Sequence, residues 1–334
     1  MRNLPTTRIL LNLSGTGRKR LQATNLEEEL AKLGHVTLFD RSTESAPHER
    51  FLELVSNADI MVTSWQSEFF RPEDVGRTGD LKLVIHGAGS VRRVITPEII
   101  ASGVRVVQCA QAIAKAVAHM TVGFILTGLW NAAGLYLHAR QGTKAGWPCR
   151  DLEDITVGLV GLSQVGRQIP PLLHPFGAKV VAYDPTWTAA AAAELGVELV
   201  DLDTLVSSAD VVSLHAPVLP QTVNMINAQR IASMRKGALF VNTARPALVD
   251  QEALFQRCYR AELTAYLDVT SPEPLPPDHP AWQCPFIFMT PHVAGPTVQT
   301  MRRIAGMIIE NVRRFQAGEP LSGEVTLERY DLIA

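Results

Sequence analysis

The sequence is poor in cysteine and carries almost no net charge. Its 334 residues include four cysteines, far apart and without a C-x-x-C pair, which excludes a disulfide framework and the common zinc sites. Cys109, Cys149, Cys258 and Cys284 are expected to be reduced thiols of a cytoplasmic protein that holds no metal. The formal net charge of −2 offers no broad attraction to nucleic acid or to an anionic membrane. Residues 1–15 also lack the apolar stretch and cleavage site of a signal peptide.

One stretch of the chain is apolar enough to raise the question of a membrane. Residues 116–137 contain no Lys, Arg, Asp or Glu, and their length would span a bilayer. However, His119, Thr121, Thr127 and Asn131 interrupt the run, and nothing else in the chain has membrane character. We therefore predict one long helix, buried in the core or at a subunit interface, and no membrane partner.

The sequence does contain a regular alternation of short apolar runs and helical stretches. Strands are predicted at 8–13, 35–39, 59–63, 81–85 and 104–108, with helices at 26–33, 49–56 and 97–101. After the apolar helix, strands are predicted at 155–160, 179–183, 211–214, 238–242, 263–267 and 286–289, and a last helix at 298–316 ends at Gly318. This alternation is typical of parallel sheets covered by helices on both faces. We expect an α/β protein of two doubly wound domains, the second with six strands.

A glycine-rich turn follows the first strand of the second half. The segment GLVGLSQVGR, residues 158–167, nearly matches G-x-G-x-x-G, with Ser163 in place of the second glycine. A buried strand leads into Gly161, and Asp184 ends the next strand, eighteen residues after Gly166. This order of strand, turn, helix, strand and acid holds a dinucleotide, with the pyrophosphate at the helix N-terminus and the acid on the ribose hydroxyls. No basic residue follows Asp184, which favours NAD over NADP.

Two features of this turn depart from the pattern. Ser163 is small, and its hydroxyl is expected to cap the first helical turn or to face a phosphate oxygen. Pro170 and Pro171 lack N–H donors and should kink or shorten the helix beyond its first turn. We predict that the turn still binds a dinucleotide. The alternative is a turn of an α/β protein that binds no nucleotide.

Three later segments carry an arginine, a glutamate and a histidine. Arg245, Glu273 and His292 each follow a different predicted strand. Because the carboxyl ends of parallel strands meet at one edge of the sheet, these residues are expected to gather there. An arginine can grip a carboxylate and a carbonyl oxygen, and a histidine oriented by a glutamate can move a hydroxyl proton. The trio suits hydride chemistry on a 2-hydroxy or 2-keto acid, although each residue alone could be structural or merely solvated.

Over nearly its whole length the chain resembles the D-isomer-specific 2-hydroxyacid dehydrogenases. Beside the three segments, the resemblance rests on LHAPVLPQT at 214–222, on HGAGS at 86–90 and on Trp147. It implies a flavodoxin-like substrate domain formed by residues 1–113 and 298–334. It also implies an inserted Rossmann NAD-binding domain of residues 114–297 and a homodimer formed through the 116–137 helix region.

The resemblance assigns roles to individual residues. It makes Arg245 the substrate-binding catalytic arginine, His292 the acid/base and Glu273 the partner of His292. The substrate carboxylate would lie on the backbone of a loop formed by Gly87, Ala88, Gly89 and Ser90. The NAD site would be formed by Gly161, Ser163, Gln164, Val165, Gly166, Asp184, His215, Ala216, Pro217, Thr222, Thr243, Ala244, Asp268 and Gly295.

The departures from the family pattern cluster on the substrate side. Pro246-Ala247 replaces two glycines, Ser90–Arg93 replaces an acidic and amide-bearing run, and Ile113 replaces a frequent asparagine. Arg92 and Arg93 are either a solvated pair or the binding site of a second anionic group on the substrate. Two other functions share the fold: an NAD(H)-sensing, co-repressor-like interaction protein, and a formate- or phosphite-type dehydrogenase. The intact arginine, glutamate and histidine favour the 2-hydroxyacid dehydrogenase.

Overall fold

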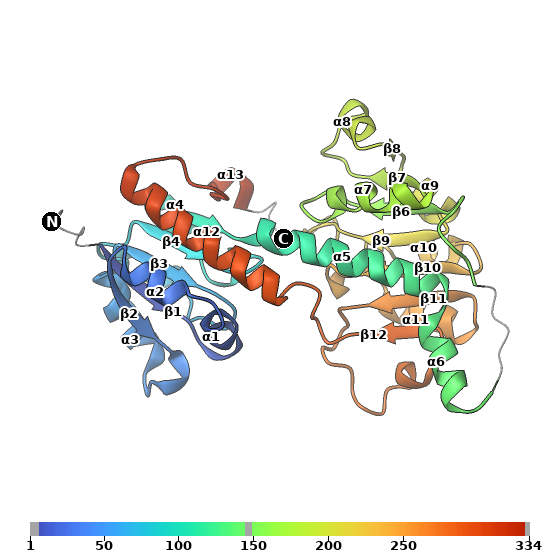
Figure 1. Cartoon of the computed structure of the whole chain (residues 1–334), viewed down its shortest axis with the longest axis horizontal. Helices are drawn as coiled ribbons and strands as arrows, with labels where there is room; N and C mark the ends of the chain where they lie inside the picture. The colour runs from blue at the N-terminus through green and yellow to red at the C-terminus, as the bar shows by residue number, and fades with distance from the viewer. Residues whose placement is uncertain (1–6, 144–148, 331–334) are drawn as a thin grey trace. The chain divides into compact units, whose positions relative to one another are not determined.

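The computed structural model describes residues 7–143 and 149–330, with Arg93 and Arg329 described by their backbone only. Trp147 lies outside these residues. The chain divides into two compact units, Met1–Ile113 with Pro296–Ala334, and Ala114–Gly295. Each unit is built on its own parallel sheet (Figure 1).

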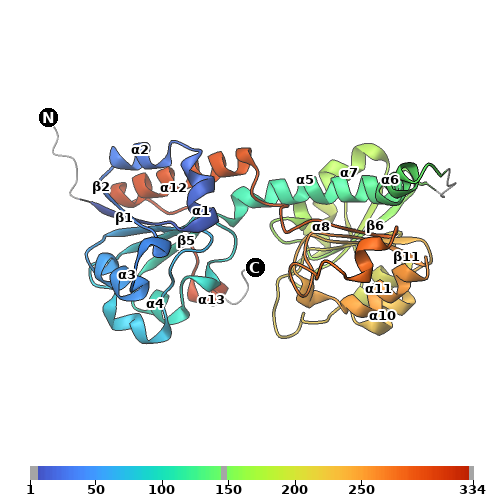
Figure 2. The same ribbon diagram turned by 90° about the horizontal axis from the view of Figure 1, so that it is seen from below.

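The first unit has a five-stranded sheet in the order β2-β1-β3-β4-β5, which is the flavodoxin-like order that was predicted. Its strands are β1 (Arg8–Asn12), β2 (His35–Phe39), β3 (Ile60–Thr63), β4 (Leu83–His86) and β5 (Arg105–Gln108). Figure 2 shows α1 (Gly15–Gln22), α2 (Leu26–Ala31) and α12 (Val298–Ala317) on one face, and α3 (Pro47–Ser56) and α4 (Pro97–Ala101) on the other. The remaining elements are η1 (Arg41–Thr43), η2 (Pro72–Arg77), η3 (Val91–Arg93) and α13 (Leu327–Tyr330).

Both faces of this sheet are buried because successive strand residues point in opposite directions. Ile9 and Leu11 of β1 pack in the cluster that contains α2 and α12, whereas Leu10 packs in the cluster that contains α3. The middle residues of β1, β3, β4 and β5 are therefore apolar and buried, whereas the edge strand β2 is only partly buried. The helix α12 ends at Gly318, which is in the left-handed conformation, as the sequence predicted; the short helix α13 follows it and was not predicted.

The second unit has a seven-stranded sheet in the order β12-β11-β10-β9-β6-β7-β8. Its strands are β6 (Thr156–Val160), β7 (Lys179–Tyr183), β8 (Glu198–Leu199), β9 (Val211–Leu214), β10 (Ala238–Asn242), β11 (Leu263–Leu267) and β12 (Ile287–Met289). The strand order changes direction at β6, as in a Rossmann sheet. Six strands were predicted, and the seventh, β8, is a two-residue edge strand too short to produce an apolar run.

Helices cover both faces of this second sheet (Figure 2). Apolar residues of α5 (Ala110–Leu129) and α7 (Pro170–Leu173) pack in one core cluster. Those of α9 (Leu202–Ser208), α10 (Ala228–Ser233) and α11 (Gln251–Tyr259) pack in the other. The remaining elements are α6 (Ala132–Arg140), α8 (Ala189–Glu194), η4 (Gly166–Gln168), η5 (His174–Phe176), η6 (Pro246–Leu248) and η7 (Pro280–Gln283).

The prediction of one long helix over 116–137 is wrong. The segment is divided between α5 and α6, and the break lies at Asn131, whose φ of 45° is left-handed. Asparagine is one of the few residues that adopt this conformation at low cost. Among the described residues, α5 alone is long and apolar enough to cross a membrane, and 61% of its apolar window is buried inside the protein. Such burial is typical of a core helix.

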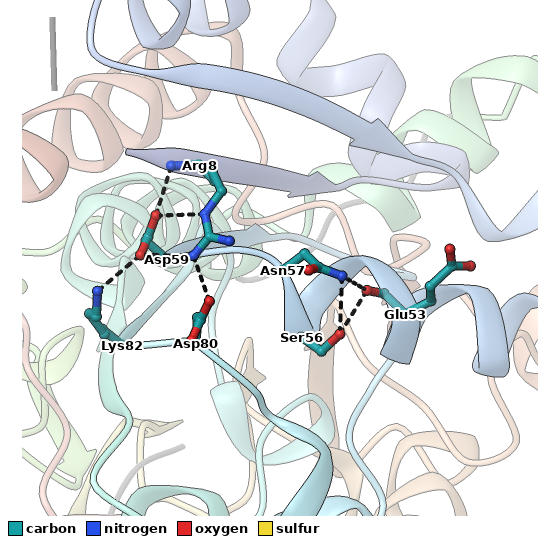
Figure 3. Close-up of polar contacts among 7 residues, drawn as sticks. All are labelled: Arg8, Glu53, Ser56, Asn57, Asp59, Asp80 and Lys82. Carbon is teal, nitrogen blue, oxygen red and sulfur yellow. Dashed lines mark hydrogen bonds and ion pairs between the residues drawn. The ribbon is translucent and has the colours of Figure 1, made fainter. Parts of the chain in front are cut away.

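Ion pairs join the amino ends of three strands in the first unit (Figure 3). Asp59 accepts hydrogen bonds from the backbone N–H of Arg8 at 3.0 Å, from its Nε at 3.1 Å and from Lys82 Nζ at 3.0 Å. A further bond of 2.9 Å links Arg8 to Asp80. Burial alone would raise the pKa of Asp59, but the bonds from Arg8 and Lys82 hold that pKa well below its usual range. These ion pairs therefore join the strands at the amino edge of the sheet, which is the edge opposite to the loops that follow the strands.

Candidate active site

The carboxyl edge of the second sheet collects most of the candidate residues. All neighbouring strands in this sheet are parallel, so their carboxyl ends share one edge. This is the edge at which ligands bind in open α/β sheets. The first residues after the strands are Gly161, Asp184, His215, Thr243, Asp268 and Thr290.

Two glycines shape the turn after β6. Gly161 has a φ of 103°, and a Cβ at this position would lie 2.8 Å from the Ala216 backbone nitrogen. A Cβ on Gly166 would overlap the Gly161 carbonyl oxygen. Only glycine permits both the backbone conformation and the close approach. Ser163 is not among the described residues with a positive φ, so its backbone conformation does not require glycine.

The Ser163 hydroxyl makes a contact that the sequence did not predict. It donates a hydrogen bond of 2.9 Å to the His215 carbonyl and so joins the β6 turn to the β9 turn. Within the described residues, no side-chain cap is found at the start of η4. The helix after the turn is interrupted, as predicted: the short segments η4, α7 and η5 follow one another, because Pro170 and Pro171 supply no N–H donors to a continuous helix.

The turn nevertheless offers donors to an anion. Within residues 7–143 and 149–330, we find no acceptor for the backbone N–H groups of Ser163, Gln164 and Val165. Consecutive unbonded N–H groups at such a turn form an anion-binding concavity. The turn therefore fits a dinucleotide pyrophosphate, even though a short 3-10 helix replaces the expected α-helix.

Asp184 is held at the end of β7 by three hydrogen bonds. Its Oδ2 accepts from the Leu162 N–H at 2.8 Å, and its Oδ1 accepts from the Thr186 N–H at 2.9 Å and from the Thr186 hydroxyl at 2.7 Å. A carboxylate accepts about four hydrogen bonds, so about one site remains for a ligand hydroxyl. The carboxylate is thus fixed beside the turn and still able to bind.

The segment after β9 contributes mainly backbone. The His215 imidazole is buried and lies 2.8 Å from the Ser213 hydroxyl. Burial lowers the pKa of His215 to about 3, so the ring is neutral. The Thr222 hydroxyl bridges the Pro217 carbonyl at 2.6 Å and the Leu219 N–H at 2.7 Å. These two side chains shape the loop, which includes Ala216.

The turn that carries Arg245 is fastened by a buried asparagine at the end of β10. The Asn242 side chain accepts from the Ala244 N–H and donates to the Arg245 carbonyl, both at 2.9 Å. The Thr243 hydroxyl lies 2.8 Å from the Thr121 hydroxyl of α5. Arg245 is half-buried, and its guanidinium donates to the Ala244 carbonyl at 2.7 Å. Pro246-Ala247 begins η6 directly afterwards and leaves the Arg245 backbone extended.

Asp268 fastens the loop that carries His292. Its buried carboxylate accepts from the Thr290 hydroxyl at 2.5 Å, the Val293 N–H at 2.9 Å and the Ala294 N–H at 3.0 Å. The His292 N–H donates to the Asp268 carbonyl at 2.9 Å. His292 has a left-handed φ of 54°, a conformation that a histidine keeps only where its surroundings impose it. Gly295 follows this loop and is half-buried.

Glu273 and His292 come together at this edge. His292 Nδ1 lies 2.7 Å from Glu273 Oε1, and the two side chains are 47% and 38% exposed. Exposed pairs of this kind add little to stability. The effect of this contact is therefore to orient the imidazole. The ring nitrogen Nε2 is left as the reactive position.

Sequence reasoning missed three residues that support the candidates. Gln251 accepts from the Ser271 N–H at 2.8 Å and donates to the Ser271 carbonyl at 2.7 Å, which steadies the loop carrying Glu273. Asn242 and Thr121 were missed as well. A polar residue closing the apolar strand Ala238–Asn242 was a usable signal for Asn242, but no local pattern identified the other two.

The loop at the carboxyl end of β4 lies in the first unit. The Gly87 N–H donates to the Thr63 carbonyl at 2.7 Å, so this expected substrate donor is already bonded. No acceptor is found in the described chain for the N–H groups of Ala88, Gly89 and Ser90. The exposed Arg92 guanidinium lies 5.9 Å from the Tyr330 ring centroid. The Arg93 side chain lies outside the described part of the chain.

Comparisons with known proteins identify relatives of this chain. Residues 122–294 match the family model described as D-isomer specific 2-hydroxyacid dehydrogenase, NAD binding domain. The chain is 34% identical over 232 residues to the glyoxylate reductase of Thermofilum pendens, covering 67% of this chain and 68% of that protein. It is 28% identical over 278 residues to the D-3-phosphoglycerate dehydrogenase of Methanocaldococcus jannaschii, covering 81% of this chain and 52% of that protein. The chain thus spans about half the length of that relative.

The fold also matches solved structures. The apo form of Rhodotorula graminis D-mandelate dehydrogenase superposes with a TM-score of 0.84 at 22% identity, covering 96% of this chain and 98% of that one. At this identity the likeness concerns the fold alone.

Proposed function

Because the chain belongs to the D-isomer-specific 2-hydroxyacid dehydrogenase family, we propose that it interconverts a D-2-hydroxy acid and its 2-keto acid, using NAD. The observation that carries this proposal is the 2.7 Å contact between Glu273 and His292 at the carboxyl edge of the Rossmann sheet. A histidine oriented by a carboxylate is suited to exchange a proton with a hydroxyl oxygen. A protein that merely senses the nucleotide needs no such pair.

His292 acts as the acid/base in this proposal. In the direction of reduction it donates a proton from Nε2 to the carbonyl oxygen of the keto acid, and in the direction of oxidation it accepts that proton. Glu273 holds the other ring nitrogen and stabilises the imidazolium form. Asp268 keeps His292 in place through the backbone of the 290–294 loop.

Arg245 binds the substrate through its guanidinium, which offers several N–H donors to carboxylate and carbonyl oxygens. The side chain of Asn242 sets the backbone from which Arg245 extends. The loop of Ala88, Gly89 and Ser90 binds the substrate carboxylate through its backbone N–H groups, and Gly87 contributes its small size and not its N–H.

The dinucleotide is held by the β6 turn and its neighbours. The N–H groups of Ser163, Gln164 and Val165 receive the pyrophosphate, and Asp184 accepts a ribose hydroxyl. When bound, NAD supplies or receives the hydride. NAD is favoured over NADP because a fixed carboxylate repels a 2′-phosphate and the adjoining Pro185-Thr186 carries no compensating base. The loops that contain Ala216, Pro217, Thr243, Ala244 and Gly295 line the nicotinamide half.

A homodimer formed through the 116–137 region is also part of the proposal. This region comprises most of α5 and the first turns of α6, where Trp130 and Tyr136 are 54% and 63% exposed. Large exposed aromatic side chains of this kind are enriched at protein interfaces. The mass in solution, measured by light scattering, should be that of two chains, and W130E/Y136E should lower it to one.

A panel of 2-keto acids tests the function, with NADH and NADPH compared by the loss of absorbance at 340 nm. The relatives named as glyoxylate reductase and D-3-phosphoglycerate dehydrogenase suggest that the panel include glyoxylate as well as phosphorylated and dicarboxylic members. We expect saturable oxidation of NADH with at least one acid and a lower kcat/KM with NADPH. Binding of NADH without turnover of any acid would instead favour the nucleotide-sensing function.

A further inference from the structure

A buried histidine ends the strand that precedes the proposed carboxylate-binding loop. His86 is the last residue of β4, between Thr63 of β3 and Gln108 of β5 in the sheet register. Its side chain is almost fully buried, with 3% of the residue exposed. The segment HGAGS at 86–90 carries part of the family resemblance, but the resemblance gives His86 itself no role, and the reaction described above does not use it.

The His86 ring has two polar partners. Nδ1 lies 2.9 Å from the Thr63 hydroxyl, which is itself fully buried. The ring is also hydrogen-bonded with the Ser90 backbone. Burial lowers the pKa of His86 to about 4, whereas the bond to Ser90 raises this pKa in part. No charged side chain contributes to the shift. A neutral imidazole has one donor nitrogen and one acceptor nitrogen, so it can serve two such partners at once.

These bonds fix the loop at its far end. Its near end is fixed separately, because the Gly87 N–H donates to the Thr63 carbonyl and the Ser64 hydroxyl donates to the Gly87 carbonyl at 3.3 Å. A Cβ on Gly87 would lie 2.9 Å from the Ile308 side chain of α12, so this end packs closely against α12. Between the two fixed ends lie the unbonded N–H groups of Ala88 and Gly89.

We propose that His86 is a positioning residue, which ties Ser90 to Thr63 and thereby holds the N–H groups of Ala88, Gly89 and Ser90 in the geometry that binds the substrate carboxylate. The inference rests on the proposed function of this loop. It predicts that His86 governs the affinity for the acid substrate and leaves the proton transfer by His292 unaffected.

His86→Leu and His86→Gln test this role in steady-state kinetics with the best 2-keto acid of the panel. His86→Leu removes both ring bonds, and His86→Gln retains polar atoms for one or both and serves if the leucine variant does not fold. We expect His86→Leu to raise KM by about tenfold or more while kcat stays within about threefold. The NADH dissociation constant, measured by fluorescence, should stay within about twofold, which a general loss of structure would not allow.

Thr63→Val provides an independent approach to the same contact. It should raise KM in the same direction, and the double variant H86L/T63V should be no worse than the poorer single variant, because both changes break one connection. His35→Leu is the matched control, since His35 is an exposed residue at the start of β2. It should leave KM unchanged.

The outcomes separate this proposal from the proposed function. A wild-type protein that reduces no 2-keto acid overturns both. An active wild type whose H86L or H86Q variant folds and keeps its KM overturns the positioning role alone. Equal losses in kcat, KM and NADH affinity would also overturn it, because they would indicate a merely structural histidine.

Discussion

At the scale of single residues, the chemistry depends on an imidazole that is exposed yet fixed. His292 is held by Glu273 at 2.7 Å and by a left-handed backbone. We expect His292→Gln to lower kcat by about 10²- to 10⁴-fold, the usual contribution of general acid–base catalysis. NADH affinity should remain within about twofold, because the side chain acts mainly in the transition state. Stopped-flow reduction and NADH titration measure both quantities, and His174→Gln, at an exposed histidine of the same unit, is the control.

Ser163 provides a second prediction at this scale. Its hydroxyl donates a hydrogen bond to the His215 carbonyl. Ser163→Ala and Ser163→Gly should therefore weaken NADH binding by no more than about tenfold, or ~1.4 kcal/mol. Isothermal titration with NADH checks this. Loss of binding in either variant would mean that the link between the two turns is essential to the nucleotide site.

The sequence could identify side chains at this scale more readily than their bonds. Arg245, Glu273 and His292 were predicted to share one edge because parallel strands share their carboxyl ends, and the sheet places them after adjacent strands. The direction of the Ser163 hydroxyl could not be predicted, because its acceptor lies 52 residues away. Likewise, the sequence could not show that the Gly87 N–H is already hydrogen-bonded, because its acceptor is the Thr63 carbonyl of another strand.

At the scale of elements, one carboxylate organises a whole loop. Asp268 accepts three hydrogen bonds from residues 290–294 while fully buried. In Asp268→Asn, one acceptor oxygen is replaced by an NH₂ donor that faces N–H groups. We expect a loss of ~2 kcal/mol in the free energy of unfolding together with a fall in kcat. His292→Gln should leave the melting temperature unchanged, so calorimetry on the two variants separates loop order from proton transfer.

The β6 turn gives a second element-scale prediction. A methyl group on Gly166 would overlap the Gly161 carbonyl, so the turn cannot keep its shape in Gly166→Ala. We expect the affinity for NADH to fall by at least tenfold, whereas the loop of Ala88, Gly89 and Ser90 in the first unit should be unaffected. Gly306→Ala is the control variant, because a Cβ on Gly306 would meet no atom within 4 Å. Gly237→Ala is less suitable, because Gly237 has a positive φ, which alanine rarely adopts.

Prediction from sequence succeeded for long, buried elements and failed at their interruptions. Apolar runs located every strand except β8, since parallel strands buried on both faces consist mainly of apolar residues. The break between α5 and α6 was missed because it depends on a left-handed Asn131 within an apolar run. The strand β8 was missed because two residues at a sheet edge carry no periodicity.

At the scale of the whole molecule, buried neutral histidines make stability depend on pH. Burial lowers the pKa of His86 to about 4 and of His215 to about 3, both below the ordinary value of 6.5. The unfolded chain therefore binds protons first as the pH falls, so the stability contributed by each neutral ring is complete above pH 6.5 and is lost progressively below it. Each should cost on the order of 2 kcal/mol by pH 5.

Urea unfolding between pH 7.5 and pH 5 measures this dependence. The Asp59 carboxylate affects stability only at lower pH. Its pKa is held below the usual value, so the stability that it contributes is lost only in strongly acidic solution. His86→Gln and His215→Gln should each flatten the profile above pH 5. A wild-type profile that is already flat in this range would contradict the burial of neutral rings.

The most direct test of the whole account follows the transferred atom. NADH carrying deuterium at both C4 positions is supplied with the best 2-keto acid, and the product is analysed by mass spectrometry and chiral chromatography. We expect the D-2-hydroxy acid with one deuterium at C2, and only background amounts from His292→Gln. An unlabelled product, or the L enantiomer, would contradict direct hydride transfer by a D-specific dehydrogenase.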